Sequence, residues 1–282
     1  MLRRFLNKCA ISAVQPIIAK RDILQRAKHP SAKFFHLLGK CARYVYYRTM
    51  QKREDYLLNI QGVWLKNRDD ATFIYCLRGY YGFAYSQHLK SKKRPFTFID
   101  IGANIGLYSL IALKNKNCTW VHAFDPDPET IPYLQANLDF TGQKNFSLHP
   151  YAVSDVAGVA SLNTREGHSG NSTISDPTFD VTGTQSVTVV NYEYLNSIIP
   201  QDNSDVSIKI DVEGHDLQVL RSLDECEFLP RVTEIFAELN SNLSDSSQVL
   251  EWFAQHGFVE SWRTGTDHWE DVLFVRIQNA NQ

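Results

Sequence analysis

The chain has 282 residues, of which 43% are hydrophobic and 12% aromatic, enough to bury one α/β core with a small additional segment. Its five cysteines are odd in number and scattered, and none forms a Cys-x-x-Cys pair, which argues against a zinc site or a disulfide framework and favours a cytoplasmic setting. Residues 1–53 hold 13 basic residues and one acid, whereas residues 54–282 hold 16 basic and 30 acidic residues, so the net charge of −2 conceals an asymmetry. The acidic remainder disfavours a nucleic-acid substrate.

Residues 1–53 are expected to form a basic, helical N-terminal arm. Asn7, Gln15 and Pro16 interrupt its apolar part, which is too short to span a bilayer, and no clean signal-peptide cleavage site follows. The basic and apolar residues could form helices on an anionic membrane surface. The favoured interpretation is a solvated basic face whose apolar side packs on the core.

Residues 54–95 are predicted to be a lead-in segment with short strands at 56–60, 63–65 and 72–75. The aromatic run at 80–85 follows. It could line a substrate cleft, although aromatic residues at this density are more often simple packing.

From residue 96 onward, strands and helices alternate in the βαβ order of a parallel sheet covered on both faces. Residues 158–183 are rich in Ser, Thr, Asn and Gly and lack helical periodicity, which predicts a mobile loop and a substrate lid. The predicted strands are 96–101, 120–124, 146–153, 187–190, 206–211, 232–238, and two closing strands near 258–263 and 271–277; the predicted helices are 105–115, 128–139, 215–223 and 246–256.

The turn after the first of these strands has the pattern of a nucleotide-binding loop. Gly102 and Gly106 permit a tight turn and a close approach of the backbone to a ligand. The order D-x-G-x-N-x-G differs from the dinucleotide pattern G-x-G-x-x-G, because Asn104 stands where a middle glycine would admit a pyrophosphate. Asp100 lies at the carboxyl end of the strand and suits a cationic ligand. S-adenosylmethionine is such a ligand and carries no phosphate.

Two further acids could contact the same cofactor. Asp125 ends the next strand, 19 residues after Gly106, where a carboxylate can accept hydrogen bonds from ribose hydroxyls. Asp155 follows the third strand, where it could accept from an adenine amine. An ordinary Asx turn explains Asp155 equally well.

Charged residues on the strand at 206–211 are the candidates for chemistry, since a central parallel strand is normally apolar on both faces. Asp211 is the first choice for general base or substrate clamp, and Lys209 could neutralise it. Glu213 and His215 follow on the turn, where His215 could remove a proton at neutral pH or cap the next helix. Glu238 ends the fifth strand. The acids could in principle hold Mg²⁺, but we expect no metal.

Four segments together resemble FkbM-type methyltransferases: residues 100–109, 123–128, 152–155 and 209–216. The resemblance extends over roughly residues 96–276. It departs from the family at Asp125, where glutamate is more common, although either carboxylate can bind a ribose. The resemblance implies a class I methyltransferase fold, S-adenosyl-L-methionine as cofactor, no metal, and O-methylation of a hydroxyl, often on a sugar or a secondary metabolite.

We therefore predict a doubly wound, mostly parallel seven-stranded α/β sheet over residues 96–282, whose last two strands form an antiparallel edge. The predicted function is methylation of a hydroxyl of a saccharide, glycoconjugate or secondary metabolite, in the cytoplasm, with peripheral membrane contact through residues 1–53 as an open alternative. An NAD-dependent oxidoreductase and a non-catalytic cofactor-binding module are the rival functions. The predicted catalytic residues are Asp211, His215, Glu213 and Lys209; the predicted cofactor-binding residues are Asp100, Gly102, Asn104, Gly106, Asp125 and Asp155.

Overall fold

A computed structural model describes residues 52–79, 81–175, 177, 179–243, 246–266 and 269–277, together with Gln15, Ile17, Ser31, Phe34, Leu37, Leu38, Lys40 and Tyr44. Most of the predicted arm, with its membrane alternative, therefore lies outside the described residues. Gln15 Nε2 donates a hydrogen bond to the carbonyl of Ile60, 3.1 Å away. Within the described ranges, no helix combines the length and the apolar character needed to cross a membrane.

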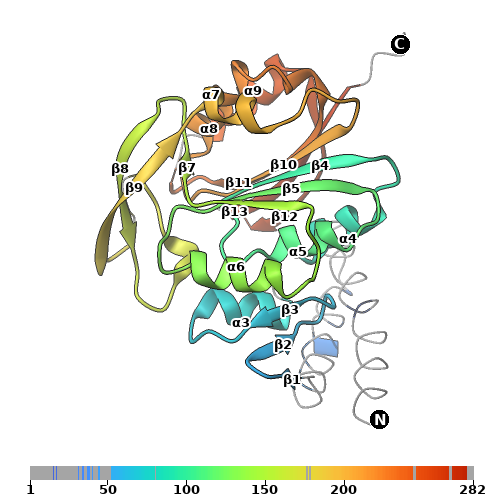
Figure 1. The fold of residues 1–282 in the computed structure, drawn as a ribbon, viewed down its shortest axis with the longest axis vertical. Helices are drawn as coiled ribbons and strands as arrows, with labels where there is room; N and C mark the ends of the chain where they lie inside the picture. The colour runs from blue at the N-terminus through green and yellow to red at the C-terminus, as the bar shows by residue number, and fades with distance from the viewer. Residues whose placement is uncertain are drawn as a thin grey trace.

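The central sheet has seven strands in the order β12-β13-β11-β10-β4-β5-β6 (Figure 1). The neighbours β11, β10, β4, β5 and β6 run parallel, whereas β13 is antiparallel to both β11 and β12. The predicted mostly parallel sheet with its antiparallel edge is confirmed. The strand bounds are β4 Phe96–Ile101, β5 Cys118–Phe124, β6 Phe146–His149, β10 Asp205–Ile210, β11 Val232–Asn240, β12 Phe258–Thr266 and β13 Trp269–Arg276.

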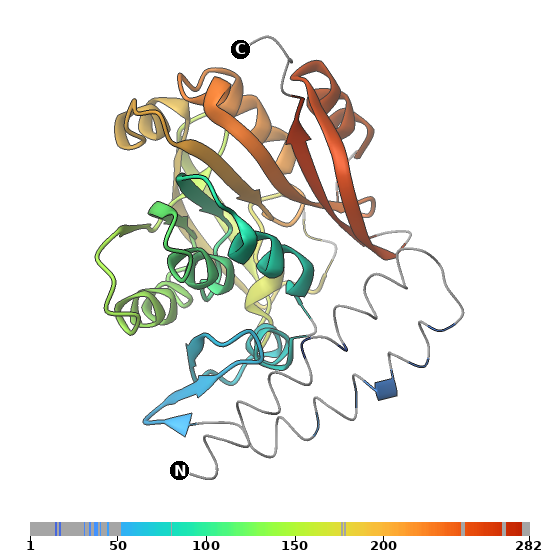
Figure 2. The ribbon, with the colours of Figure 1, turned by 90° about the vertical axis from the view of Figure 1, so that its right-hand side faces the viewer.

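Helices cover both faces of this sheet (Figures 1 and 2). Both faces need this cover because the strands are apolar on each side. In β4, which is buried throughout, successive side chains point to opposite faces of the sheet. Phe96 and Phe98 pack in one hydrophobic cluster, and Ile99 and Ile101 pack in the other. The first cluster includes residues of α4 Phe83–Ser91, α5 Leu107–Leu113 and α6 Ile131–Asp139; the second includes residues of α7 Tyr192–Ile198, α8 Asp216–Asp224 and α9 Ser246–Gln255.

The lead-in segment combines a small sheet with a helix. Strands β1 Lys52–Arg53, β2 Tyr56–Leu58 and β3 Trp64–Lys66 pair antiparallel. The strand predicted at 72–75 is wrong, because these residues lie in α3 Ala71–Arg78. The side chain of Asp70 accepts from the Phe73 amide at the start of α3, and Gly79 ends the helix in the left-handed conformation.

A third sheet, in the order β7-β9-β8, stands beside the central sheet (Figure 1). It consists of β7 Ala152–Val153, β8 Gly158–Thr164 and β9 Gly183–Val190. The single strand predicted at 146–153 is therefore two strands, β6 and β7, in different sheets. The loop predicted at 158–183 is also wrong in part, because this block contains β8 and the short 3₁₀ helix η1 Ser169–Asn171.

Candidate active site

A cavity of about 460 Å³ opens at the carboxyl ends of the parallel strands. This is where ligands bind in open α/β sheets, and the volume falls in the usual range for small-molecule sites. Seven of the ten predicted site residues line it: Gly102, Asn104, Asp125, Lys209, Asp211, Glu213 and His215. The remaining three, Asp100, Gly106 and Asp155, do not belong to its lining.

The glycine turn brings the two central loops into direct contact. Gly102 has a φ of +77°, and a Cβ on this residue would lie 1.9 Å from the backbone oxygen of Asp211. The amides of Gly102 and Ala103 both donate to the carbonyl of Phe124 at the end of β5, at 3.0 and 2.8 Å. Gly106, with a φ of +85°, precedes the first residue of α5. The turn is thus fixed against β5 and against the turn that follows β10.

Asp125 lies in the cavity wall and is 6% exposed. Its carboxylate accepts hydrogen bonds from the amides of Asn104, at 2.8 Å, and Asp127, at 3.0 Å. Burial raises the pKa of Asp125 to about 6. Because the Asn104 amide already binds this acid, the turn presents a carboxylate where a pyrophosphate site would present free N–H groups. The occupied Asn104 amide disfavours a pyrophosphate, whereas S-adenosylmethionine carries no phosphate; the Asp125 carboxylate itself suits the ribose of either cofactor.

Asp100 lies beneath the cavity and is fully buried. One carboxylate oxygen accepts from both the amide and the hydroxyl of Ser109, at 3.0 and 2.6 Å. The other oxygen lies 3.8 Å from the ammonium of Lys209. In the structure, Asp100 therefore anchors the first turn of α5 to the sheet and faces Lys209 from below.

Lys209 joins the glycine turn to Asp211. Its ammonium donates to the carbonyls of Ile101 and Gly102 and lies 3.3 Å from Asp211 Oδ2. Burial favours the neutral amine, but the carboxylates of Asp211 and Asp100 outweigh it, so the pKa of Lys209 lies above its ordinary value. Tyr81 Oη donates to the same Asp211 oxygen at 2.5 Å. Both donors contact Oδ2.

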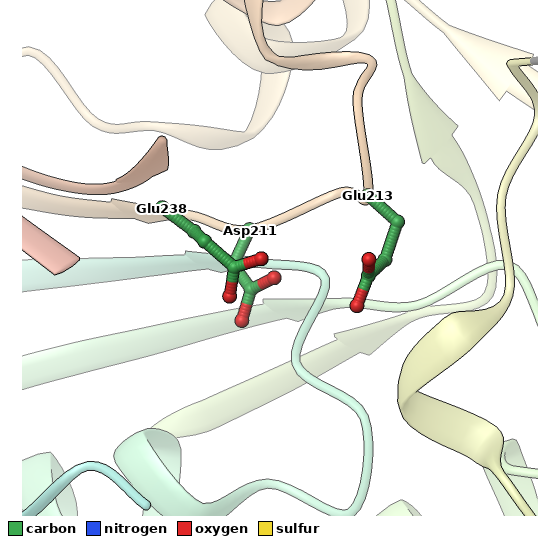
Figure 3. A group of neighbouring side chains, drawn as sticks. All are labelled: Asp211, Glu213 and Glu238. Carbon is green, nitrogen blue, oxygen red and sulfur yellow. The ribbon is translucent and has the colours of Figure 1, made fainter. Parts of the chain in front are cut away.

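Three carboxylates converge in the cavity. Oxygen atoms of Asp211, Glu213 and Glu238 lie within 4.8 Å of one another, and Figure 3 shows the three side chains directed into one space. Burial, followed by the charge of Asp211, raises the pKa of Glu213 and of Glu238. The same two causes raise the pKa of Asp271, on the neighbouring strand β13, to about 7. Such a group favours a proton, a cation or hydrogen-bond donors between its members.

His215 connects the turn after β10 to two serines. Its Nε2 lies 2.9 Å from Ser154 Oγ, and its Nδ1 lies 3.2 Å from Ser175 Oγ. Burial lowers the pKa of His215, so the ring is neutral at pH 7. His215 is the N-cap residue of α8, but its side chain makes no capping hydrogen bond to that helix. Asp155 lies beside this group and accepts from Ser154 Oγ at 3.0 Å.

The segment around η1 forms one wall of the cavity and is attached to α3. Ser169 donates through its amide and its hydroxyl to Asp70, at 2.8 and 3.1 Å, and the Gly170 amide donates to Thr72 Oγ1 at 2.9 Å. Thr173 Oγ1 donates to the carbonyl of Glu213 at 2.8 Å. The loop predicted to be a lid thus lies against the site, held by α3, whose residues 72–75 were predicted to be a strand.

Aromatic residues complete the wall of the cavity, and the sequence pattern pointed to only one of them. Tyr81 belongs to the aromatic run at 80–85, for which a role in a cleft was one of two interpretations. Tyr75, on α3, and Trp269, on β13, also line the cavity, and about half of each side chain is exposed. No local pattern distinguished Tyr75 or Trp269 from other surface aromatics.

Comparisons with known proteins identify the family of the chain. Residues 100–260, more than half of the chain, match the family model of the methyltransferase FkbM domain. The hexuronic acid methyltransferase AglP of Haloferax volcanii is 26% identical over 64% of this chain and 70% of its own length. The 31-O-demethyl-FK506 methyltransferase FkbM of Streptomyces tacrolimicus is 25% identical over 62% of this chain and 77% of its own length.

Solved structures resemble the chain more distantly. The M. capricolum TrmK complex with S-adenosyl-homocysteine is 12% identical, with a TM-score of 0.42, over 69% of this chain and 68% of that chain. The ribosomal protein L11 methylase of Lactobacillus delbrueckii subsp. bulgaricus is also 12% identical with a TM-score of 0.42, over 70% of this chain and 81% of that chain. The assignment therefore rests on the family match: the chain belongs to the FkbM methyltransferase family and is a methyltransferase that uses S-adenosyl-L-methionine.

Proposed function

We propose that this enzyme methylates a hydroxyl oxygen of a saccharide, a glycoconjugate or a secondary metabolite. The observation that carries the proposal is the position of Asp211, which is held by Lys209 and Tyr81 at the cavity end of β10, directly beside the cofactor turn. Two relatives support this acceptor class, since their names specify a hexuronic acid and an O-demethylated natural product as substrates.

S-adenosylmethionine supplies a methyl group made electrophilic by its sulfonium. We propose that Asp125 holds the ribose hydroxyls, while Gly102 and Asn104 allow the backbone to approach the cofactor. Asp100 and Gly106 act indirectly, by fixing the turn and the start of α5. Asp155 is proposed for the adenine edge, although its carboxylate contacts Ser154 in the structure.

Asp211 is proposed to remove the proton of the acceptor hydroxyl. The two donors on Oδ2 fix the orientation of the carboxylate and leave Oδ1 for the hydroxyl. A positioned base contributes about 10²–10⁴-fold to the rate, and alignment of the acceptor oxygen with the methyl group contributes at best ~7–11 kcal/mol. Glu213 and Glu238 are proposed to form hydrogen bonds with further hydroxyls of the acceptor. His215 is proposed to position the turn through its two serine contacts.

The test compares Asp211→Asn with Asp205→Asn. Asp205 begins the same strand at its other end, where it pairs with the exposed Arg94. Transfer of labelled methyl groups from S-adenosylmethionine to a pool of hydroxylated acceptors should fall about 10²–10⁴-fold in Asp211→Asn and stay unchanged in Asp205→Asn. S-adenosylhomocysteine should bind both variants within threefold of the parent. Undiminished transfer by Asp211→Asn would contradict the proposed base. Intact binding without transfer by the parent would favour a non-catalytic module.

A further inference from the structure

We propose that Asp100 is a positioning residue for the reaction and not a ligand of the cofactor. It holds the buried ammonium of Lys209 in its charged form, and that ammonium in turn orients the carboxylate of Asp211. This role rests on the proposed function, because Asp211 is the proposed base. The link between Asp100 and Lys209 is nevertheless measurable without any acceptor.

The three charged groups lie together on two neighbouring strands. Asp100 and Lys209 are opposite each other in the parallel register of β4 and β10, and Asp211 follows Lys209 by two residues. The side chains of Asp100 and Lys209 are 0% and 2% exposed. The ammonium lies 3.8 Å from Asp100 Oδ1 and 3.3 Å from Asp211 Oδ2. The cation is thus placed between a fully buried acid and an acid that lines the cavity.

The two oxygens of Asp100 have different surroundings. Oδ2 accepts from the amide and the hydroxyl of Ser109, whereas Oδ1 has no hydrogen-bond partner among the described residues. Burial raises the pKa of Asp100, while Lys209 and the bonds from Ser109 act in the opposite direction. Anchoring of α5 uses Oδ2 alone, so it does not explain the position of Oδ1 beside the ammonium.

The charge of Lys209 depends on these acids. Burial favours the neutral amine, but Asp211, followed by Asp100, raises the pKa of Lys209 above its ordinary value. Of the acids that the structure describes, Asp100 and Asp211 alone lie within 4.0 Å of the ammonium. The ring of Tyr108, with its centre 6.0 Å away, also favours the cation. The more distant titratable groups around Lys209 are Cys76 on α3, Asp125 after β5, Glu213 on the next turn, Glu238 on β11 and Asp271 on β13.

The charge of Lys209 bears directly on the proposed base. The ammonium and the hydroxyl of Tyr81 both contact Oδ2 of Asp211. A neutral amine would remove the ion pair and leave Tyr81 to orient the carboxylate alone. Asp100 therefore acts on the base through Lys209, without touching the reacting atoms.

The first experiment measures the charge of Lys209 directly. Full-length protein labelled with ¹³Cε-lysine is titrated by NMR from neutral to alkaline pH, and Lys209→Arg identifies the Lys209 resonance by its loss. Asp100→Asn keeps the size of the side chain and removes its charge, so Lys209 should lose its proton about 1–3 pH units below the parent. Ser109→Ala removes a donor to Asp100 but keeps the acid, so it should leave this titration unchanged. An unshifted titration in Asp100→Asn would overturn the proposal.

Unfolding by urea at pH 8 separates this role from simple anchoring of α5. In the parent, Asp100→Asn removes a counter-charge of Lys209, so the urea midpoint should fall. In Lys209→Met, Asp100 is a buried acid without its cation, so the same change should raise the midpoint. A fall of equal size in both backgrounds would show an anchor and nothing more, and would overturn the proposal.

Turnover and cofactor binding connect this charge to the reaction. The alkaline limb of the pH profile of kcat should move down in Asp100→Asn by the shift measured for Lys209. S-adenosylhomocysteine should bind Asp100→Asn within threefold of the parent, since Asp100 does not line the cavity. Binding weakened at least tenfold would make Asp100 a cofactor ligand and overturn the proposal.

Failure of the proposed function is distinguishable from failure of this role. Full transfer by Asp211→Asn would remove the proposed base, and the role of Asp100 in the reaction with it, whatever the titration of Lys209 shows. An inactive Asp211→Asn together with an unshifted Lys209 titration in Asp100→Asn would leave the base in place and overturn the role of Asp100 alone.

Discussion

Replacement of Gly102 by alanine tests whether contact between the cofactor turn and the turn after β10 assembles the site. Gly102 has a φ of +77°, and a Cβ there would lie 1.9 Å from the backbone oxygen of Asp211. Cβ contacts shorter than 3.0 Å essentially never occur, so the two turns would have to separate by about 1.1 Å. Both groups in this contact are backbone, so no flexible side chain can absorb the shift.

Gly142 provides a matched control. Its φ is +71°, and a Cβ there would meet no atom within 4 Å. Alanine at either position pays about 1–2 kcal/mol for the left-handed conformation. The forced separation at Gly102 adds ~1–3 kcal/mol. We therefore expect Gly102→Ala to lose about 2–5 kcal/mol of unfolding free energy and Gly142→Ala about 1–2 kcal/mol.

Gly102→Ala should also lose methyl-transfer activity where the variant is still folded, so its lower unfolding free energy does not account for the loss. A misplacement of ~1 Å can cost about 10²-fold in rate, so Gly102→Ala should reduce methyl transfer at least that much under conditions where it stays folded. Urea unfolding, titration with S-adenosylhomocysteine and turnover would be measured on both variants and the parent. Equal losses of stability in the two variants, with turnover unaffected in Gly102→Ala, would refute the reasoning.

Three further predictions concern individual side chains. Burial raises the pKa of Asp125 from 3.8 to about 6, so the carboxylate that we propose binds the ribose should become protonated below pH 6. Affinity for S-adenosylhomocysteine should therefore fall there in the parent and stay nearly flat in Asp125→Asn. The same shift favours the folded state below about pH 4, and this contribution is lost as pH rises through 6, so Asp125→Asn should lack that part of the pH dependence of urea unfolding. Tyr81→Phe removes a donor to Asp211 worth ~1.5–3 kcal/mol, which predicts a fall of about 10–100-fold in kcat with cofactor affinity unchanged; an unaltered kcat would contradict it. Asp70→Ala should lower the unfolding free energy by about 1–2 kcal/mol and raise KM for the acceptor, whereas the exposed Asp69→Ala should do neither.

The central sheet and the cofactor turn could be predicted because their signals are local. Buried strands such as residues 96–101 carry apolar residues on both faces, and the D-x-G-x-N-x-G turn marks the start of the following helix. Asp211 was also predicted to lie beside the crevice, with Glu213 and His215 on the turn that follows, since ligands bind at the carboxyl ends of parallel strands. Asp100 was predicted to bind the cofactor, but it does not line the cavity. Its place at the strand end was correct, but the alternation of β4 turns its side chain toward Ser109, away from the cavity lining.

The remaining errors arose where distant parts of the chain determine the structure. Residues 72–75 resembled a strand, yet Asp70 caps a helix there and also binds Ser169, 99 residues away. Strand β8 lies in a segment rich in turn-forming residues, and its pairing with β9 across the η1 segment stabilises it. Tyr81 and Asp211 meet across 130 residues, a contact that no local pattern announces.

The most direct test of the account is calorimetric titration of the full-length protein with S-adenosylhomocysteine, beside Asp125→Ala and with NAD as a control. The account predicts binding to the parent protein, at least tenfold weaker binding to Asp125→Ala, and no binding of NAD. Equal affinity of both proteins for S-adenosylhomocysteine, or binding of NAD in its place, would contradict the assignment of this cavity to the methyl donor.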